Sequence, residues 1–256
     1  SLENISIPEI VTALGESAFH SCSNIKNLQI PENVTAIRFA TFCQCESLLN
    51  ITIPRNIIRM GDLAFGYCTS LNKVVFLCDI ESVADFSFVK CISLQNITII
   101  GSVGKFEYES FSSCISLPYM IFPESTTYIS SLSFFNCTCL KYVIIKGNLT
   151  LFGPGIFQQC IDLEYVIYLG LVIESCGLKN FDNTKTKFVY VKKEYPYKSF
   201  CDFPIEYLPT STFSFAQKIT FKCFISSTKE FTQSRIFSFS NFFSESKQFT
   251  LSDKFL

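Results

Sequence analysis

Cysteine is the residue type in this sequence that offers the most chemistry. The chain holds 13 Cys, enough for a disulfide framework or a thiolate metal site. Seven of them recur every 23 residues, at Cys22, Cys45, Cys68, Cys91, Cys114, Cys137 and Cys160. A small residue that returns at one place in a repeat suits a packed core, because free Cys behaves as a small hydrophobe. We therefore interpret these seven as buried thiols and expect no metal and no cofactor.

The six other Cys are Cys43, Cys78, Cys139, Cys176, Cys201 and Cys223. Disulfides between successive Cys of the regular series are disfavoured. Stacked side chains point the same way, so the Cβ–S–S–Cβ torsion near 90° that a disulfide needs is hard to reach. Among the irregular residues, Cys176 with Cys201 is the candidate disulfide.

Catalytic side chains are sparse. The single histidine, His20, lies beside Phe19 and has no partner that the pattern fixes, so acid–base or Ser-His chemistry would rest on it alone. Carboxylates hold no fixed repeat position, which argues against an acid pair or a repeating Ca²⁺ loop. We expect a solvent-exposed turn for His20, no catalytic residues and no enzymatic activity.

Composition narrows the class of protein further. The net charge is −1, with both signs spread along the chain, so no basic surface points to nucleic acid. Hydrophobic residues make up 48%, which indicates a folded chain. No window reaches the roughly 18 to 20 apolar residues of a membrane-spanning helix. We expect a fragment or processed form at Ser1, and a membrane anchor, if the native protein has one, beyond Leu256.

The cysteine interval belongs to a longer motif, Phe-x2-Cys-x2-Leu-x2-Ile-x-Ile. Its first copy is Phe19, Cys22, Ile25, Leu28 and Ile30, and the Phe returns at Phe42, Phe65, Phe88, Phe111, Phe134 and Phe157. Seven copies follow one another without an insertion or deletion. The period of 23 lies within the 20 to 29 residues of leucine-rich repeats.

Two short extended segments per repeat would position these residues. The main one alternates, as in Leu28-Gln29-Ile30 and Ile51-Thr52-Ile53, so its first and third residues should point inward. An apolar pair such as Val34 and Ile37 precedes it. We expect the main segments to stack into one parallel sheet of a right-handed, mainly β solenoid, because no single repeat can bury its own apolar face.

The repeats divide the chain into three parts. Residues 1–191 should form the solenoid, with a truncated first repeat and seven full turns. In 192–212 we expect a closing segment, since Asn180 and Asn183 already replace the Phe and Cys of the motif. In 213–256 a six-residue period of Phe or Ile followed by Ser or Thr takes over, which is compatible with an extended ribbon or with a flexible stalk.

The recurring Ile-Pro-x2-Val-x2-Ile…Ala-Phe-x2-Cys-x2-Leu-x2-Ile-x-Ile-Pro, as from Ile30-Pro31 to Ile53-Pro54, closely resembles the BspA-like leucine-rich repeats of bacterial and protist surface antigens. The resemblance covers residues 1 to about 191. The tail is similar to the Phe/Ser/Thr-rich segment of some protist members. The resemblance implies a cell-surface or secreted protein that adheres to matrix proteins or to other cells, and it implies no catalytic residues.

The outward positions of the main strands are the candidate site, because a solenoid aligns them into one surface. The first half of this face is polar, with residues such as Asn27, Asn50 and Thr52. The second half is a stripe of Tyr and Ile, the type of surface that marks protein partners; the predicted protein-binding residues are Tyr119, Ile121, Tyr142, Ile144, Tyr165, Ile167, Phe188 and Tyr190. Covering of the stripe by the C-terminal segment or a neighbouring chain is the competing explanation.

The sequence favours a cell-surface adhesin or antigen whose ligand is a matrix protein or a host-cell surface protein. Six Asn-x-Ser/Thr sequons give modest support to a secretory route; they begin at Asn4, Asn33, Asn50, Asn96, Asn136 and Asn148. Two alternatives stay open: an intracellular repeat scaffold with reduced Cys, and a hydrolase with an unrecognised site.

Overall fold

The computed structural model describes residues 3–208, almost all of the first of two compact units, Ser1–Glu206. This part of the chain is built from strands and turns without a helix. The second unit is Tyr207–Leu256. Since the described residues end at 208, the predicted hexapeptide tail at 213–256 and Cys223 lie outside them.

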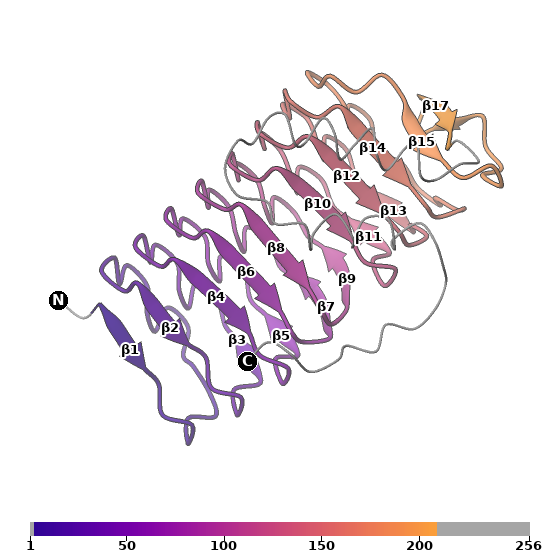
Figure 1. Cartoon of the computed structure of the whole chain (residues 1–256). Coiled ribbons are helices and arrows are strands. Elements are labelled where there is room, and N and C mark those ends of the chain that lie inside the picture. Colours follow the sequence, from indigo (N-terminus) through magenta and orange to yellow (C-terminus); the bar gives the residue numbers. More distant parts are fainter. Residues whose placement is uncertain (1–2, 209–256) are drawn as a thin grey trace, which may run out of the picture. The chain divides into compact units, whose positions relative to one another are not determined.

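Each turn of the described chain contributes one strand to a main row of strands (Figure 1). The row consists of β1 (Asn4–Ser6), β2 (Asn27–Gln29), β4 (Asn50–Ile53), β6 (Lys73–Phe76), β8 (Asn96–Ile99), β10 (Tyr119–Phe122), β12 (Tyr142–Ile145), β14 (Tyr165–Tyr168) and β15 (Val189–Val191). Parallel partners are 23 residues apart, as in Tyr119 with Tyr142. The predicted solenoid with 23-residue turns is therefore confirmed.

A second row of strands comes from the apolar pair that precedes the Phe of the motif. It consists of β3 (Ala36–Ile37), β5 (Arg59–Met60), β7 (Ile80–Val83), β9 (Val103–Phe106), β11 (Tyr128–Ile129) and β13 (Leu151–Phe152). Strands β7, β9, β11 and β13 form one parallel sheet, and β3 pairs with β5. The prediction of two extended segments per turn is confirmed for these six turns, whereas residues 11–15 of the first turn form no strand.

The expectation of one continuous main sheet is wrong. The main strands form two sheets, β1-β2-β4-β6-β8 and β10-β12-β14-β15-β17-β16, and Figure 1 shows a wider step between β8 and β10. In the turns on either side, the residue just before the strand donates its N–H to the preceding turn, as Gln95 does to Asn72 and Lys141 does to Pro118. Pro118 holds this position before β10 and has no N–H to donate.

The rings of the motif form a ladder through the core. Ring centroids of successive Phe lie between 4.9 and 5.3 Å apart from Phe19 to Phe134, nearly parallel to one another. From Phe42 to Phe157 each ring is fully buried. Offset aromatic stacking adds to the burial of each ring, so the ladder links every turn to the next.

The regular Cys form a second ladder beside the rings. From Cys45 to Cys160, each thiol donates a hydrogen bond to the carbonyl of the Phe in the preceding turn, at 3.1 to 3.3 Å. Burial raises the pKa of the Cys45 thiol to about 12, so this thiol stays protonated and can keep donating. The interpretation as buried thiols is confirmed for these six, whereas Cys22 in the first turn is half-buried.

In the last turn the Phe position of the motif is filled by a different residue from the one that the sequence count predicts. Asn180 is aligned with the Phe series by count, but the ring that continues the ladder is Phe181, which stacks on Phe157 at 6.2 Å. One extra residue in this turn makes the substitution possible, because Phe152 bridges to Cys176, 24 residues later. Asn180 is buried and accepts a hydrogen bond from the backbone N–H of Ile156.

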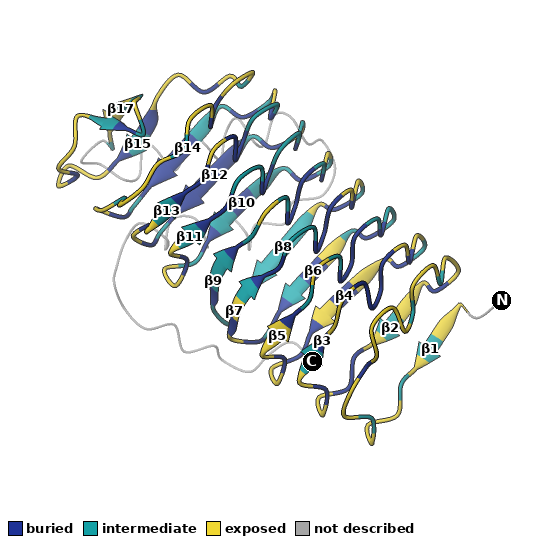
Figure 2. Ribbon diagram, turned by 180° about the vertical axis from the view of Figure 1, so that it is seen from behind, coloured by how far each residue is buried: buried dark blue, intermediate teal, exposed yellow. Residues whose placement is uncertain are grey.

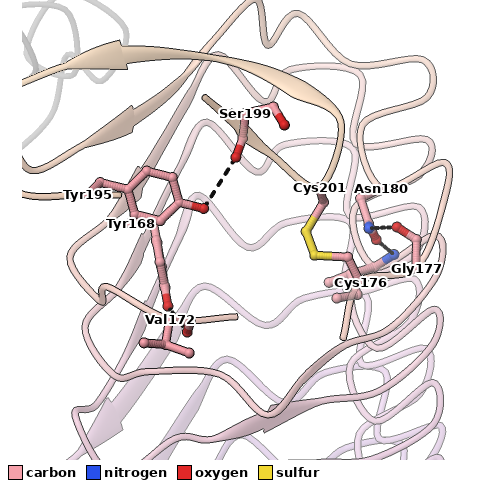
Figure 3. Close-up of a disulfide and its surroundings, with 9 residues drawn as sticks. Tyr168, Val172, Cys176, Gly177, Asn180, Tyr195, Ser199 and Cys201 are labelled. Carbon is pink, nitrogen blue, oxygen red and sulfur yellow. Dashed lines mark hydrogen bonds between the residues drawn. A yellow bond between two sulfur atoms is a disulfide. The ribbon is translucent and has the colours of Figure 1, made fainter. Parts of the chain in front are cut away.

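The C-terminal end of the stack is closed by β16 (Ser199–Phe200) and β17 (Phe203–Tyr207), which pair antiparallel. The predicted disulfide between Cys176 and Cys201 is present, with Cα atoms 5.4 Å apart (Figure 3). Beside it, the buried Tyr168 hydroxyl donates to the carbonyl of Val172. The ring of Tyr168 also contacts that of Phe200 edge to face, with centroids 5.1 Å apart, so the disulfide and this ring contact join the closing segment to the last turns.

We expect Phe88→Ala to lower the free energy of unfolding by about 3 to 5 kcal/mol, because it removes a ring packed between two others and leaves a cavity. The centroid of Phe88 lies 5.2 Å from that of Phe65 and 4.9 Å from that of Phe111. Chemical denaturation measures the effect. The matched control is Phe39→Ala, since Phe39 is 47% exposed, and equal losses for both variants would contradict the ladder.

Replacing both Cys176 and Cys201 with Ser should destabilise the protein by about 3 kcal/mol, because the bridge closes a loop of 25 residues and restricts the unfolded chain. Thermal unfolding with and without reductant measures this. Cys139→Ser is the control, since Cys139 is a free, exposed thiol. A double variant with wild-type stability would show that the bridge has no structural role.

Candidate functional site

The only histidine lies in an exposed turn, as predicted. Its Nδ1 is 2.8 Å from the Ser21 hydroxyl, which also lies 2.7 Å from Oε1 of Gln44. The contact with Ser21 was not expected. No described carboxylate orients His20 in these contacts, and the dyad is exposed to water, so the arrangement lacks the oriented base of a Ser-His hydrolase.

Within residues 3–208, no group of three or more His, Cys, Asp or Glu is placed to hold a metal ion. The same residues include no helix that could cross a membrane. The outward face of the main strands is the candidate site that the sequence predicts.

The first half of this face is polar and exposed. Asn27, Gln29, Asn50 and Thr52 are all exposed on β2 and β4. The Asn27 side-chain amide donates to the side-chain carbonyl of Asn4 one turn earlier, at 3.0 Å. Figure 2 shows much of β2 and β4 in yellow, in contrast to the dark blue of β12. Exposed amide and hydroxyl side chains give this half of the face a polar surface that water can reach.

The second half brings the predicted aromatic residues into register. Tyr119, Tyr142 and Tyr165 are successive partners in β10, β12 and β14, and Ile121, Ile144 and Ile167 accompany them. The rings of Tyr119 and Tyr142 are stacked, with centroids 5.3 Å apart and an angle of 5° between their planes. We call these six residues, together with Phe188 and Tyr190, the aromatic stripe.

The stripe is less exposed than the sequence suggests. Tyr142 is 8% exposed, Ile144 is 1% exposed and Ile167 is fully buried, so the expectation of a continuous exposed apolar area is wrong for these three. By contrast, Thr52 at the equivalent position of β4 is exposed. The accessible members are Tyr119, Ile121, Tyr165, Phe188 and Tyr190.

The stripe consists of a column of Tyr and, beside it, a column of Ile, and the two columns meet at the last turn. The ring of Tyr165 stacks on Tyr190, at 6.1 Å, rather than on Phe188 as the repeat count implies. Burial raises the pKa of the Tyr190 hydroxyl, and the carboxylate of Glu206 adds to the shift. Phe188 is 41% exposed and is the most accessible ring of the stripe.

Sequence-based reasoning missed the charged residues beside the stripe and the opening at its edge. Lys141 and Glu164 are half-buried, each directly before a Tyr of the stripe. Ile97 and Ile99, inward residues of β8, are half-exposed, whereas the inward residues of β6 are buried. A proline before the main strand, which occurs only at Pro118 among the turns, is the signal that could have located the opening.

Comparison with known proteins identifies the repeats. The model of the BspA type leucine rich repeat region matches residues 1–118 and 81–203, with six copies. No curated protein sequence matches the chain significantly.

Two solved structures of leucine-rich repeat proteins are similar to this chain. A leucine-rich repeat protein of T. pallidum is 27% identical, with a TM-score of 0.54, over 72% of this chain and 84% of that one. A leucine-rich repeat protein from Bacteroides ovatus is 23% identical over 73% of this chain and 67% of that one, with a TM-score of 0.37. The family model spans most of the described solenoid, and the chain belongs to the BspA-type leucine-rich repeat family.

Proposed function

We propose that this protein is a non-enzymatic adhesin or antigen, on the cell surface or secreted, that binds a protein ligand through the aromatic stripe. The observation that carries the proposal is the register of Tyr119, Tyr142 and Tyr165 on three neighbouring strands. Successive turns place these side chains about 5 Å apart on one face, a spacing that a single ligand surface can span.

The chemistry of the stripe favours a protein over a sugar phosphate or a metal. Tyr rings offer a large contact area at a low cost in side-chain entropy, and their hydroxyls orient polar groups of the partner. Lys141 and Glu164 provide charges of both signs beside the rings, as in the polar rim of an interface. The accessible Tyr119, Tyr165 and Phe188 would make the first contacts, while the buried Tyr142 and Ile144 support them.

The location outside the cell is supported by the bridge between Cys176 and Cys201, since stable disulfides form in oxidising compartments. An intracellular scaffold would keep both thiols reduced. A hydrolase would need converging catalytic side chains, and the exposed pair of His20 and Ser21 does not supply them. Family membership also favours a surface antigen, with a matrix protein or a host-cell surface protein as the ligand.

The double variant Tyr165→Ser with Phe188→Ser should weaken binding to a matrix protein or host cell by about 1 to 2 kcal/mol or more, roughly 5- to 30-fold in Kd. Surface plasmon resonance with candidate matrix proteins, and cell binding in parallel, measure the effect. Asn50→Ser on the polar half of the face is the control and should be near neutral. Unchanged binding by the double variant, with the fold intact by circular dichroism, would place the site elsewhere.

The location is tested separately by labelling intact cells with a reagent that does not cross membranes. Labelling of the full-length protein, together with a Cys176–Cys201 peptide in a non-reducing digest, is the expected result. Protection from the reagent and two free thiols would favour the intracellular scaffold.

A further inference from the structure

The main row of strands is interrupted between β8 and β10, and no other strand of the described residues pairs with the two edges that face each other there. Within residues 3–208, no pairing joins β8 to β10. Their Cα atoms lie for the most part more than 8 Å apart, whereas paired strands lie about 4.8 Å apart. An inserted strand needs about twice that distance, roughly 9.6 Å between its two neighbours.

The interruption is confined to one side of the solenoid. The turns that carry the motif Phe and Cys, which we call the Cys side, stay hydrogen-bonded here. The backbone N–H of Phe88 donates to the carbonyl of Ser110 at 2.8 Å, and the backbone N–H of Lys90 donates to the carbonyl of Ser112 at 2.8 Å. The second row also continues, because β7, β9 and β11 pair in order. The gap is therefore an opening in one wall of an otherwise continuous stack.

Two features of the sequence distinguish the turn at the gap from its neighbours. Pro118 removes the N–H that closes this position in neighbouring turns. In the core of the same turn, the buried rings of Phe106 and Phe122 meet edge to face, with centroids 4.9 Å apart. The residues equivalent to Phe106 in the adjacent turns are the smaller Val83 and Ile129, so this turn holds more side-chain volume than its neighbours.

We propose that the gap between β8 and β10 accepts an extended segment of the protein ligand as an additional strand; this rests on the proposed function. The unused backbone donors and acceptors of β8 and β10 specify an extended peptide backbone, as in recognition by strand addition. The half-exposed Ile97 and Ile99 specify aliphatic residues at alternate positions. Tyr119 and Ile121 on β10 make the gap continuous with the aromatic stripe.

The probe is a labelled peptide that copies residues 141–146, whose strand already pairs in parallel with β10 on its other edge. A photoreactive group replaces the outward residue that corresponds to Ile144. The control peptide has Pro in place of Val143, which removes a backbone N–H. We expect saturable binding by fluorescence anisotropy, at least tenfold weaker for the control, and cross-links to residues 96–99 and 119–122.

The matched protein variant is Pro118→Lys, which restores the N–H that Lys141 provides in the next turn. It should bind the peptide at least tenfold more weakly. Cross-links outside β8 and β10 in the wild-type protein, or equal binding of the two peptides, would overturn the proposal without a variant that must fold. A dimer cross-linked through these strands in the absence of peptide would overturn it in favour of a second copy as the occupant.

The two proposals fail in different ways. Loss of ligand binding in the Tyr165/Phe188 variant together with peptide cross-links elsewhere would retain the aromatic stripe and remove the strand insertion. Peptide capture in the gap with unchanged ligand binding by that variant would refute the stripe as the binding site.

Discussion

The constant register of 23 residues is the constraint on which the rest of the structure depends. Because each turn repeats the preceding one without an insertion up to Cys160, Phe stacks on Phe and each ladder Cys finds a Phe carbonyl. A single turn could not bury these groups. The same register aligns outward residues into columns, so the core and the candidate site have one geometric origin. In the last turn the offset is 24 residues at Ile173 and Cys176, and after β15 the stack ends in a disulfide-bonded closing segment.

Much of the fold could be predicted because period and alternation report directly on packing. The inward direction of Ile51 and Ile53, the burial of six of the seven regular Cys and the bridge between Cys176 and Cys201 are all confirmed. The burial of Ile144 and Ile167 could not be predicted, since alternation gives the direction of a side chain and not what surrounds it. The sheet interruption falls at Pro118, whose missing N–H a hydrophobic pattern does not report.

The interruption also divides the face by chemistry. The five-stranded sheet presents amides and hydroxyls, such as Asn50 and Thr52, whereas the sheet that begins at β10 presents the aromatic stripe. A hydrated half gains little from contact with a protein, and an aromatic half gains much. The proposed interface is therefore concentrated on β10, β12, β14 and β15 and extends at the edge of β10 into the gap that faces β8.

The most direct measurement of this account is residue-resolved hydrogen exchange of the free protein. If one register holds the stack while Pro118 opens one wall, the amides of the Cys-side ladder, such as Phe65 and Phe88, should exchange slowly without a break along the chain. The amides at the facing edges of β8 and β10 should exchange much faster than those between β10 and β12. Uniform protection across all main strands, or rapid exchange of the Cys-side ladder, would contradict it.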